Sequence, residues 1–265
     1  MRQTHKLLKA VYLIAAIAIV VPGPVNAEDW EWTIAPYLWA SNASLDLTVR
    51  DDTTIGGDAA FKDLLDKVDS VFMGRFEGRK GRWGLYLDTI YLNISDDKSV
   101  SVGPGGPILS DLEADASMKM KLYDAGALYR LREPGDDLQF DLLAGTRYVD
   151  VDVELDLTLP GPAMMPIDIR TGPSETDLML GARLIGRFAD RWHWGLRGDF
   201  SFGGTEGTYN GLASMGYTFG ESRLFTVTAG YRYMSIDIEG TSQRGNPIEA
   251  DVTLSGPILG LVFNF

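Results

Sequence analysis

The chain has 265 residues, of which 45% are apolar and 11% aromatic, so neither a disordered chain nor a short disulfide-stabilised protein fits. It contains no cysteine and only two histidines, His5 and His193. Disulfides and cysteine-ligated metals are therefore excluded, and little is left for histidine-based metal or triad chemistry. With 37 acidic against 24 basic residues the net charge is −13, which argues against a nucleic-acid partner. We expect no cofactor and no metal site.

Residues 1–27 are predicted to be a cleaved secretory signal. Basic Arg2, Lys6 and Lys9 precede an apolar run at 10–21, and small residues up to Ala27 provide a cleavage site. A retained anchor is the alternative, but a membrane helix needs roughly 20 apolar residues, more than this run supplies. We expect residues 28–265 to form one domain. Because no later stretch has the pattern of a membrane helix, that domain is either soluble or a closed β-barrel.

Apolar residues follow a period of two from Trp32 onward, which is typical of half-buried strands. We predict about ten strands, with eight to twelve as the range. The ten segments are 32–48, 71–78, 82–95, 118–131, 138–159, 176–189, 192–203, 209–220, 224–239 and 251–265. Long and short connections alternate between them, except for the short connection near Gly204. This alternation is typical of bacterial transmembrane barrels, which have short periplasmic turns and longer outer loops.

A soluble β-sandwich or lipocalin-like barrel is the competing architecture, since its strands alternate in the same way. Two features favour the membrane. The polar face of the strands carries glycine and arginine rather than a scatter of solvated side chains, and aromatic residues gather near one predicted boundary. These are Trp30, Trp32, Trp83, Tyr129, Trp192, Trp194, Phe219, Phe225, Phe263 and Phe265. The predicted fold class is all-β, an antiparallel up-and-down transmembrane β-barrel.

The C-terminus alternates Leu259, Leu261, Phe263 and a terminal Phe265, and it resembles the assembly signal of Gram-negative outer-membrane proteins. The segments Trp32–Trp39 and Arg75–Tyr86 look like those of a group of uncharacterised proteobacterial outer-membrane barrels. The resemblance implies an integral outer-membrane location after export through the periplasm. It also implies contact with membrane lipid and lipopolysaccharide, and recognition by the barrel assembly machinery. It implies no particular activity, and any small-molecule ligand stays unknown.

The polar face of the strands predicts a charged lumen. Gly-x-Arg recurs at Gly145, Gly181, Gly195 and Gly230, and we expect these glycines to make room for arginines that cross the interior. The predicted lumen network comprises Arg75, Glu77, Asp88, Asp124, Arg130, Asp141, Arg147, Arg183, Arg187, Arg197, Asp199 and Arg232. Because buried guanidinium groups need carboxylate partners, we interpret this set as a plug that narrows the barrel. A constriction that favours anions is the alternative.

Two loop-side features carry weaker hypotheses. Apolar residues spaced as on a helix over 58–69 predict a short amphipathic helix, either a lid over the barrel mouth or a lipid or ligand contact. Past Tyr148 the apolar parity of the fifth strand reverses, which suggests a bulge or an extension beyond the membrane. The resulting acidic row, with further carboxylates in the loop before it, could bind calcium or bridge to lipopolysaccharide. A solvated strand face explains it equally well, and we predict no metal site.

No catalytic residues are predicted. His193 is the only histidine of the mature chain, and its nearest serine in sequence is Ser201, eight residues away along the same strand. We predict a non-enzymatic, porin-like barrel with a narrow or plugged lumen, in a structural, surface-interaction or small-solute passage role. The alternatives are an open channel for small, possibly anionic, solutes and a barrel hydrolase acting on lipid or peptide.

Overall fold

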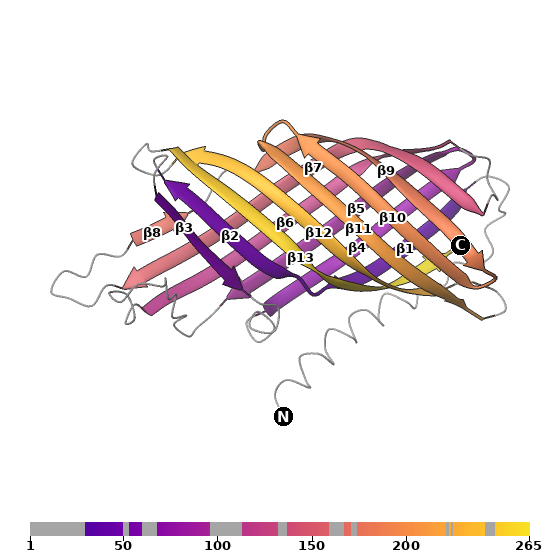
Figure 1. Ribbon diagram of the computed structural model, residues 1–265, viewed down its shortest axis with the longest axis horizontal. Helices are drawn as coiled ribbons and strands as arrows, with labels where there is room; N and C mark the ends of the chain where they lie inside the picture. Colours follow the sequence, from indigo (N-terminus) through magenta and orange to yellow (C-terminus); the bar gives the residue numbers. More distant parts are fainter. Residues whose placement is uncertain are drawn as a thin grey trace, which may run out of the picture.

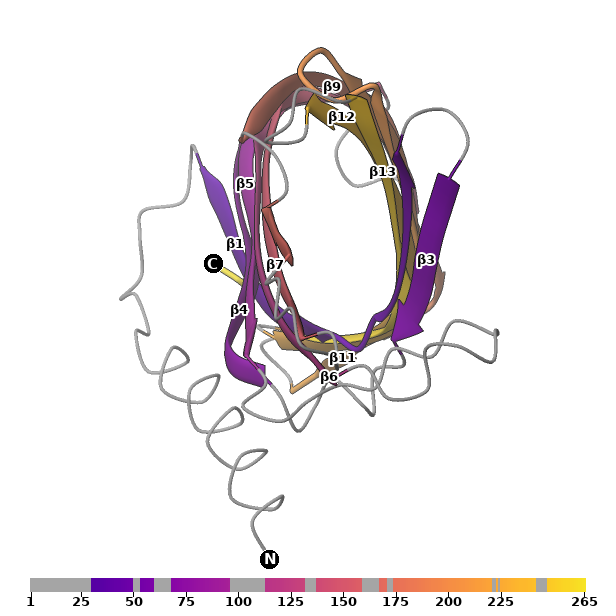
Figure 2. The same ribbon diagram turned by 90° about the vertical axis from the view of Figure 1, so that its left-hand side faces the viewer.

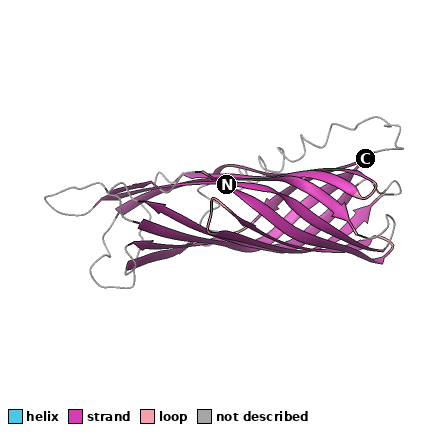
Figure 3. Cartoon of the chain, turned by 90° about the horizontal axis from the view of Figure 1, so that it is seen from above, coloured by secondary structure: helices cyan, strands magenta, loops and turns pink. Residues whose placement is uncertain are grey.

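The computed structural model describes residues 30–49, 53–59, 68–95, 113–131, 137–158, 167–170, 174–220, 223, 225–241 and 247–265. Every regular element in these ranges is a strand (Figure 3). They are β1 (Glu31–Trp39), β2 (Asn42–Val49), β3 (Thr53–Ala59), β4 (Val68–Lys80), β5 (Trp83–Ser95), β6 (Glu113–Arg130), β7 (Leu138–Thr158), β8 (Ile167–Arg170), β9 (Glu175–Ala189), β10 (Trp192–Phe202), β11 (Gly207–Phe219), β12 (Phe225–Thr241) and β13 (Pro247–Asn264). The described residues form no helix that is long and apolar enough to cross a membrane.

Ten of these strands close into an antiparallel barrel. The circuit runs β1-β4-β5-β6-β7-β9-β10-β11-β12-β13 and returns to β1, because Thr33 of β1 lies opposite Glu77 of β4 on one side and Asn264 of β13 on the other. Figure 1 shows the tilt of the strands, and Figure 2 shows that they form a flattened ring. The predicted fold class is thus confirmed. Closure matters because it leaves no strand edge unpaired in the ring.

The remaining strands lie outside this circuit. β2 continues the path of β1 along β13, and β3 folds back on β2 as a hairpin. β8 pairs with β7 beyond the point where β9 pairs with it. All three therefore extend the wall at one end of the barrel, as Figure 1 shows on its left.

The two ends of the barrel differ, and we name them by what they carry. The turn end holds both Trp30 and Phe265 and the two-residue connections at Gly81-Arg82 and Asp190-Arg191. The backbone groups of Trp32 and Phe265 bond each other there, with N to O distances of 3.1 and 2.9 Å. The loop end carries the opposite connections, together with β3 and β8.

The predicted strand segments coincide with the observed ones to within a few residues at most ends, but the helix predicted over 58–69 is wrong at both of its ends. Asp58 belongs to β3 and Val68 to β4, while residues 60–67 lie outside the described ranges. β3 pairs with β2 and β4 with β5, so the backbone groups at both ends of this segment are bonded in the sheet. A helix as short as the predicted one would be only marginally stable by itself.

The outer wall of the barrel is apolar over a broad belt. Its exposed large side chains include Phe72, Phe76, Trp83, Leu85, Leu87, Leu178, Leu180, Leu196, Phe200, Tyr209, Met215, Tyr231, Tyr233 and Leu259. A water-facing surface rarely carries a contiguous apolar patch of this size, whereas a lipid-facing barrel requires one. Around the turn end the aromatic rings stack in series, with centroids 5.1 Å apart for Phe219 and Phe225 and 5.4 Å apart for Trp30 and Trp32.

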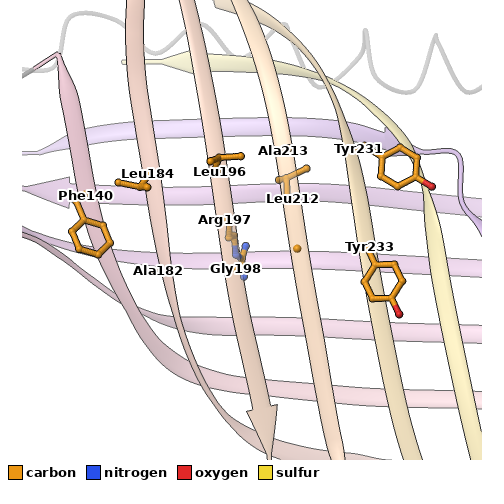
Figure 4. A pocket seen from close by; sticks show the side chains of 11 residues that line it. Phe140, Ala182, Leu184, Leu196, Arg197, Gly198, Leu212, Ala213, Tyr231 and Tyr233 are labelled. Carbon is orange, nitrogen blue, oxygen red and sulfur yellow. The ribbon is translucent and has the colours of Figure 1, made fainter.

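A hollow of about 530 Å³ interrupts this belt. Figure 4 shows it on the outer wall over β7 and β9–β12, lined by Phe140, Ala182, Leu184, Leu196, Arg197, Gly198, Gly211, Leu212, Ala213, Tyr231 and Tyr233. Gly198 and Gly211, which lie opposite each other in the register, are among its lining residues. The hollow faces the same side as the apolar belt, so it belongs to the lipid-facing surface and not to the lumen.

The inner wall changes character along the barrel axis. On β7 the odd-numbered residues face inward from Asp141 through Arg147 to Val149 and Val151, and the pairing of β7 with β6 shows no register shift. The apolar residues do change parity past Tyr148, but the bulge offered as one explanation is wrong, because the strand continues without a register shift. This continuity fits the other explanation, an extension of the strand beyond the membrane. The same face is charged in the belt and apolar toward the loop end, where it packs in a buried cluster with Met120, Leu122 and Met234, among others.

Three of the four Gly-x-Arg glycines, Gly145, Gly181 and Gly230, lie where two neighbouring backbones approach closely. A Cβ atom at Gly145 would run into the Ala125 carbonyl oxygen of β6, and one at Gly230 would run into the Ala213 carbonyl oxygen of β11. Glycine in a strand often marks a bend or a close approach of two backbones. At Gly145, Gly181 and Gly230 the expectation that the glycine makes room for a crossing arginine is thus replaced by a role in strand approach. At Gly195 a Cβ atom would meet no backbone atom closer than 3.9 Å.

Gly145→Ala should lower the free energy of unfolding by about 1–3 kcal/mol, because two packed backbones have to separate. Gly198 is the matched control, since a Cβ there meets nothing within 4 Å. Gly198→Ala should be neutral or stabilise by up to about 1 kcal/mol. Urea unfolding of both variants in detergent micelles measures the difference, and equal effects would contradict the steric explanation.

Candidate functional site in the barrel interior

A network of charged side chains occupies the barrel interior on the turn-end side of the apolar cluster. It is built from inward-facing positions on nine of the ten barrel strands. Its members are Tyr37, Arg75, Glu77, Arg79, Asp88, Asp124, Arg130, Asp141, Arg147, Arg183, Arg197, Asp199, Asn210 and Arg232. We call this set the lumen network.

Asp141 and Glu77 organise the part nearest the turn end. The Asp141 carboxylate accepts hydrogen bonds from Arg130 Nε at 2.9 Å, Arg79 Nη2 at 3.0 Å and Arg183 Nη2 at 2.7 Å. Arg183 also donates two hydrogen bonds to Glu77, at 2.8 and 2.9 Å. Arg183 lies on β9 and Glu77 on β4, with β5, β6 and β7 between them in the ring. This bidentate pair therefore crosses the lumen.

Arg147 and Arg197 organise the middle layer. Arg147 donates through Nε and Nη2 to Asp124 at 2.8 and 2.9 Å, and it reaches Asp199 at 2.7 Å. Arg197 donates to Asp199 at 2.7 Å and to both Asp88 and Asp124 at 3.3 Å. Since β10 and β5 are not neighbours in the ring, the Arg197–Asp88 pair also spans the interior.

Arg232 completes the network on the opposite wall. Its Nε donates to Asn210 Oδ1 at 2.8 Å and its Nη1 to Tyr37 Oη at 3.2 Å. Tyr37 in turn donates its hydroxyl proton to Asp88 at 2.7 Å. The Arg232 guanidinium also lies 4.9 Å from the centroid of the Trp39 ring, which belongs to the apolar cluster. Arg232 thus stands at the boundary between the charged and apolar layers.

The centre of the network is inaccessible to water. Asp124, Asp141 and Arg147 have 0% of their surface exposed. A water-filled passage through a ring of ten strands would leave the side chains that line it exposed. Buried charged groups are stabilised only when they are paired and hydrogen-bonded. Each of these three side chains is bonded to at least two charged partners, and Arg147 Nη1 is their one polar atom without a partner. At this level the side chains fill the barrel.

Eleven of the twelve predicted network residues lie together, and the prediction was wrong for Arg187. This arginine is exposed beside the turn end, where its Nε lies 3.5 Å from the exposed Asp137 carboxylate. Its strand position is close enough to the rim for water to solvate it. Sequence reasoning missed Arg79, because we assigned residues 79–81 to a turn, whereas β4 extends through Lys80 and keeps Arg79 on the inner face.

Tyr37 and Asn210 were also missed, because a charge count over inward positions passes over neutral side chains. Strand parity could have identified both. Tyr37 faces the same side of β1 as Trp39, and Asn210 faces the same side of β11 as Thr208. A further buried carboxylate, Asp177, lies apart from the network.

Asp177 anchors the short loop between β10 and β11. Its carboxylate accepts hydrogen bonds from Ser201 Oγ at 2.8 Å, Thr205 Oγ1 at 2.6 Å and the backbone N–H groups of Gly204 and Thr205, both at 2.9 Å. One carboxylate thus accepts hydrogen bonds from four donors of this turn, so the turn needs no longer loop to pair its polar groups. This explains why the connection near Gly204 is short where the alternation predicts a long one.

His193 lies at the turn end, distant from the Asp177 group. Its Nε2 is 2.8 Å from Thr218 Oγ1, which is itself 2.8 Å from Thr226 Oγ1. Among the described residues no serine or carboxylate bonds the imidazole. The imidazole contacts a threonine hydroxyl, but a catalytic base is in turn oriented by a third group, and no carboxylate among the described residues bonds this ring. His193 is therefore placed as a polar partner of Thr218.

Carboxylates gather on the outer wall at the loop end. Asp237, Asp251 and Asp46 lie side by side on β12, β13 and β2, and they follow Tyr233 beyond the apolar belt. Asp150 on β7 is neutralised by Lys121, whose Nζ lies 2.7 Å from it. The side chains of Asp152, Glu154 and Asp156 lie outside the described set, as do residues 96–112 of the preceding loop. No group of three or more potential ligands with metal-binding geometry occurs among the side chains that the structure describes.

Comparisons with known proteins agree on the fold. No protein-family model matches the chain, and no curated sequence matches it. The chain is similar in structure to the outer membrane protease OmpT from Escherichia coli, with a TM-score of 0.52 and 10% identity over 92% of this chain and 99% of that one. It also matches OprG, an outer membrane protein from Pseudomonas aeruginosa, with a TM-score of 0.36 and 11% identity over 89% and 96% of the two chains. The fold is that of Gram-negative outer-membrane β-barrels.

Asp141→Asn should lower the free energy of unfolding by about 3–5 kcal/mol, because it leaves three buried arginines short of a counter-charge. Asp190→Asn is the matched control. Asp190 pairs with Arg223 at 2.7 Å on the exposed rim, and its loss should change stability by less than about 1 kcal/mol. Urea titration of the folded fraction measures both, and a small effect of Asp141→Asn would contradict the network's structural role.

Asp251→Asn should raise the unfolding midpoint at neutral pH. Burial and the neighbouring Asp237 and Asp46 carboxylates raise the pKa of Asp251 above its ordinary value. The ionised form is therefore destabilising in the folded state, and stability is lost as the pH rises through this raised pKa. The gain from Asp251→Asn should vanish below about pH 3.9, the ordinary pKa of aspartate.

Asp150→Asn is the control for Asp251→Asn, because Asp150 faces Lys121 instead of another acid. It should not raise the midpoint at any pH. A stabilisation of equal size in both variants would show that net charge alone, and not the juxtaposed carboxylates, is responsible.

Proposed function

We propose that this protein is a non-enzymatic integral outer-membrane barrel whose lumen is closed by the lumen network, and that it acts through its loop end in a structural or surface-interaction role. The observation that carries the proposal is the complete burial of Asp124, Asp141 and Arg147 inside a ring whose arginines pair across the interior. A solute would have to break several charge-assisted hydrogen bonds to pass.

The outer-membrane location is supported by the apolar belt and by the stacked aromatic rings at the turn end. In such barrels the termini and short turns lie in the periplasm, so the loop end would face outward. The alternating C-terminal residues Leu259 and Phe265 are exposed on the lipid side. We propose that they contact membrane lipid in the folded barrel and serve as the assembly signal before it closes, and that lipopolysaccharide surrounds the loop-end half of the belt.

The wall beyond the belt supports a surface role. There β6, β7, β12 and β13 continue past the level of Tyr148 and Tyr233, with apolar residues inside and polar ones outside. This is the pattern of a water-exposed β-structure, and it builds a rigid rim around the loop end. The outward row of Asp46, Asp237 and Asp251 makes part of this rim acidic.

The hydrolase alternative draws on the likeness to a protease, but an identity of 10% shows the fold alone. The contacts of His193 do not support it, since no carboxylate among the described residues orients the ring that bonds Thr218. Incubation of the folded protein with labelled lipid A, phospholipid and peptide should give no turnover. Sustained hydrolysis of any of the three would overturn the non-enzymatic proposal.

Planar bilayer recordings test the closed lumen. The folded protein should give no large, steady conductance steps, whereas regular steps would favour the open-channel alternative. Arg197→Leu extends the test, because it leaves Asp88, Asp124 and Asp199 without this arginine. We expect the unfolding midpoint to fall, by a free energy of about 3–5 kcal/mol. A larger conductance at unchanged stability would instead identify Arg197 as part of a selective constriction.

A further inference from the structure

Among the residues that the structure describes, the buried interior contains one more positive charge than its carboxylates neutralise, even when Asp177, which lies apart from the lumen network, is counted. Its seven arginines are Arg75, Arg79, Arg130, Arg147, Arg183, Arg197 and Arg232, and its six carboxylates are Glu77, Asp88, Asp124, Asp141, Asp177 and Asp199. Arginine cannot lose its proton in a protein, so burial does not remove the excess charge. A single uncompensated charge in a water-inaccessible interior is costly.

The excess charge can be assigned to Arg232. Each of the other six arginines has a carboxylate oxygen within 4.0 Å. Arg232 has none among the described residues, and its partners Asn210 and Tyr37 are neutral. Its hydrogen bonds reach Asp88 only through the Tyr37 hydroxyl, although its positive charge also interacts with that carboxylate. Arg232 is nevertheless 3% exposed, so bulk water does not compensate for the missing counter-ion.

Two hydrogen-bond donors at this place have no partner. Arg232 Nη2 is buried and unbonded, and so is the indole Nε1 of Trp39, the ring over which the guanidinium lies. Trp39 is also 3% exposed. Buried polar groups in folded proteins nearly always have partners, so an unpaired one calls for an explanation such as a bound water or ion. Arg79 Nη1 and Arg147 Nη1 are also buried and unbonded, but each of those guanidinium groups has a carboxylate partner. Here a cation without a counter-ion and a neutral N–H donor lie together.

We propose that this corner of the lumen binds one small monovalent inorganic anion, such as chloride, between Arg232 Nη2 and Trp39 Nε1. The anion would supply the missing negative charge and accept both free hydrogen bonds. On the Trp39 side the surroundings are apolar, because Met73 and Met234 belong to the same cluster as this ring. Apolar walls disfavour divalent or large oxyanions, which need more donors, and methionine side chains adjust readily around a small guest. The site does not depend on whether the barrel conducts.

Bromide provides the direct probe. Crystals of the folded barrel grown in sodium bromide should show an anomalous peak within hydrogen-bond distance of Arg232 Nη2 and Trp39 Nε1. Arg232→Gln should abolish this peak, and Trp39→Phe, which keeps the ring but removes the N–H, should weaken it. Density for a water molecule without anomalous signal, or bromide found only at exposed side chains, would overturn the proposal.

Solution stability provides the second measurement. At constant ionic strength the unfolding midpoint temperature should be about 2–4 °C higher in sodium chloride than in sodium gluconate, because only the folded state binds the anion. Trp39→Phe should reduce this difference. Arg223→Gln is the matched control, since it removes an exposed arginine paired with Asp190 and should leave the difference unchanged. An equal midpoint for the unmodified protein in the two salts would refute the site even if Arg232→Gln fails to fold.

Discussion

The interior of a narrow membrane barrel imposes one constraint on everything else in this structure: charges that face inward must find their partners inside the ring. The lipid belt forces apolar residues outward, so the intervening positions face inward whatever their character. Here they are arginines and carboxylates, and their pairs join strands that are not neighbours, such as β4 with β9 and β5 with β10. The network therefore links opposite walls in addition to filling the space between them.

Beyond the belt the same strands carry apolar residues on the inner face and charged residues on the outer face. On β7 the inward row passes from Arg147 to Val149, while the outward row passes from Tyr148 to Asp150. One continuous strand is thus organised for lipid over part of its length and for water over the rest. A water-exposed wall buries its apolar face, and the apolar cluster at the loop end results. This change of solvent accounts for what a sequence pattern alone presents as a reversal of parity.

The fold was largely predictable, because a period of two and alternating connection lengths depend on local sequence. The lumen set was predictable for the same reason: once the strand parity is known, Arg147 and Asp199 must face inward. What could not be predicted depends on pairing across the ring. Arg79 requires knowing that β4 continues to Lys80, and Arg187 requires knowing how close it lies to solvent. The hairpin of β2 and β3 likewise depends on tertiary pairing, which overrides the helical spacing of apolar residues over 58–69.

The seam between β1 and β13 joins the beginning of the described chain to its end. Trp32 and Phe265 exchange backbone hydrogen bonds there, and Thr33 bonds Asn264 across a separation of 231 residues. Contacts this remote in sequence form late and slowly, since the intervening chain has to be ordered first. The edge of β1 that faces β13 accordingly stays unpaired until β13 is ordered. Until the ring closes, this edge is open to pairing with another chain, so the unclosed barrel is prone to self-association.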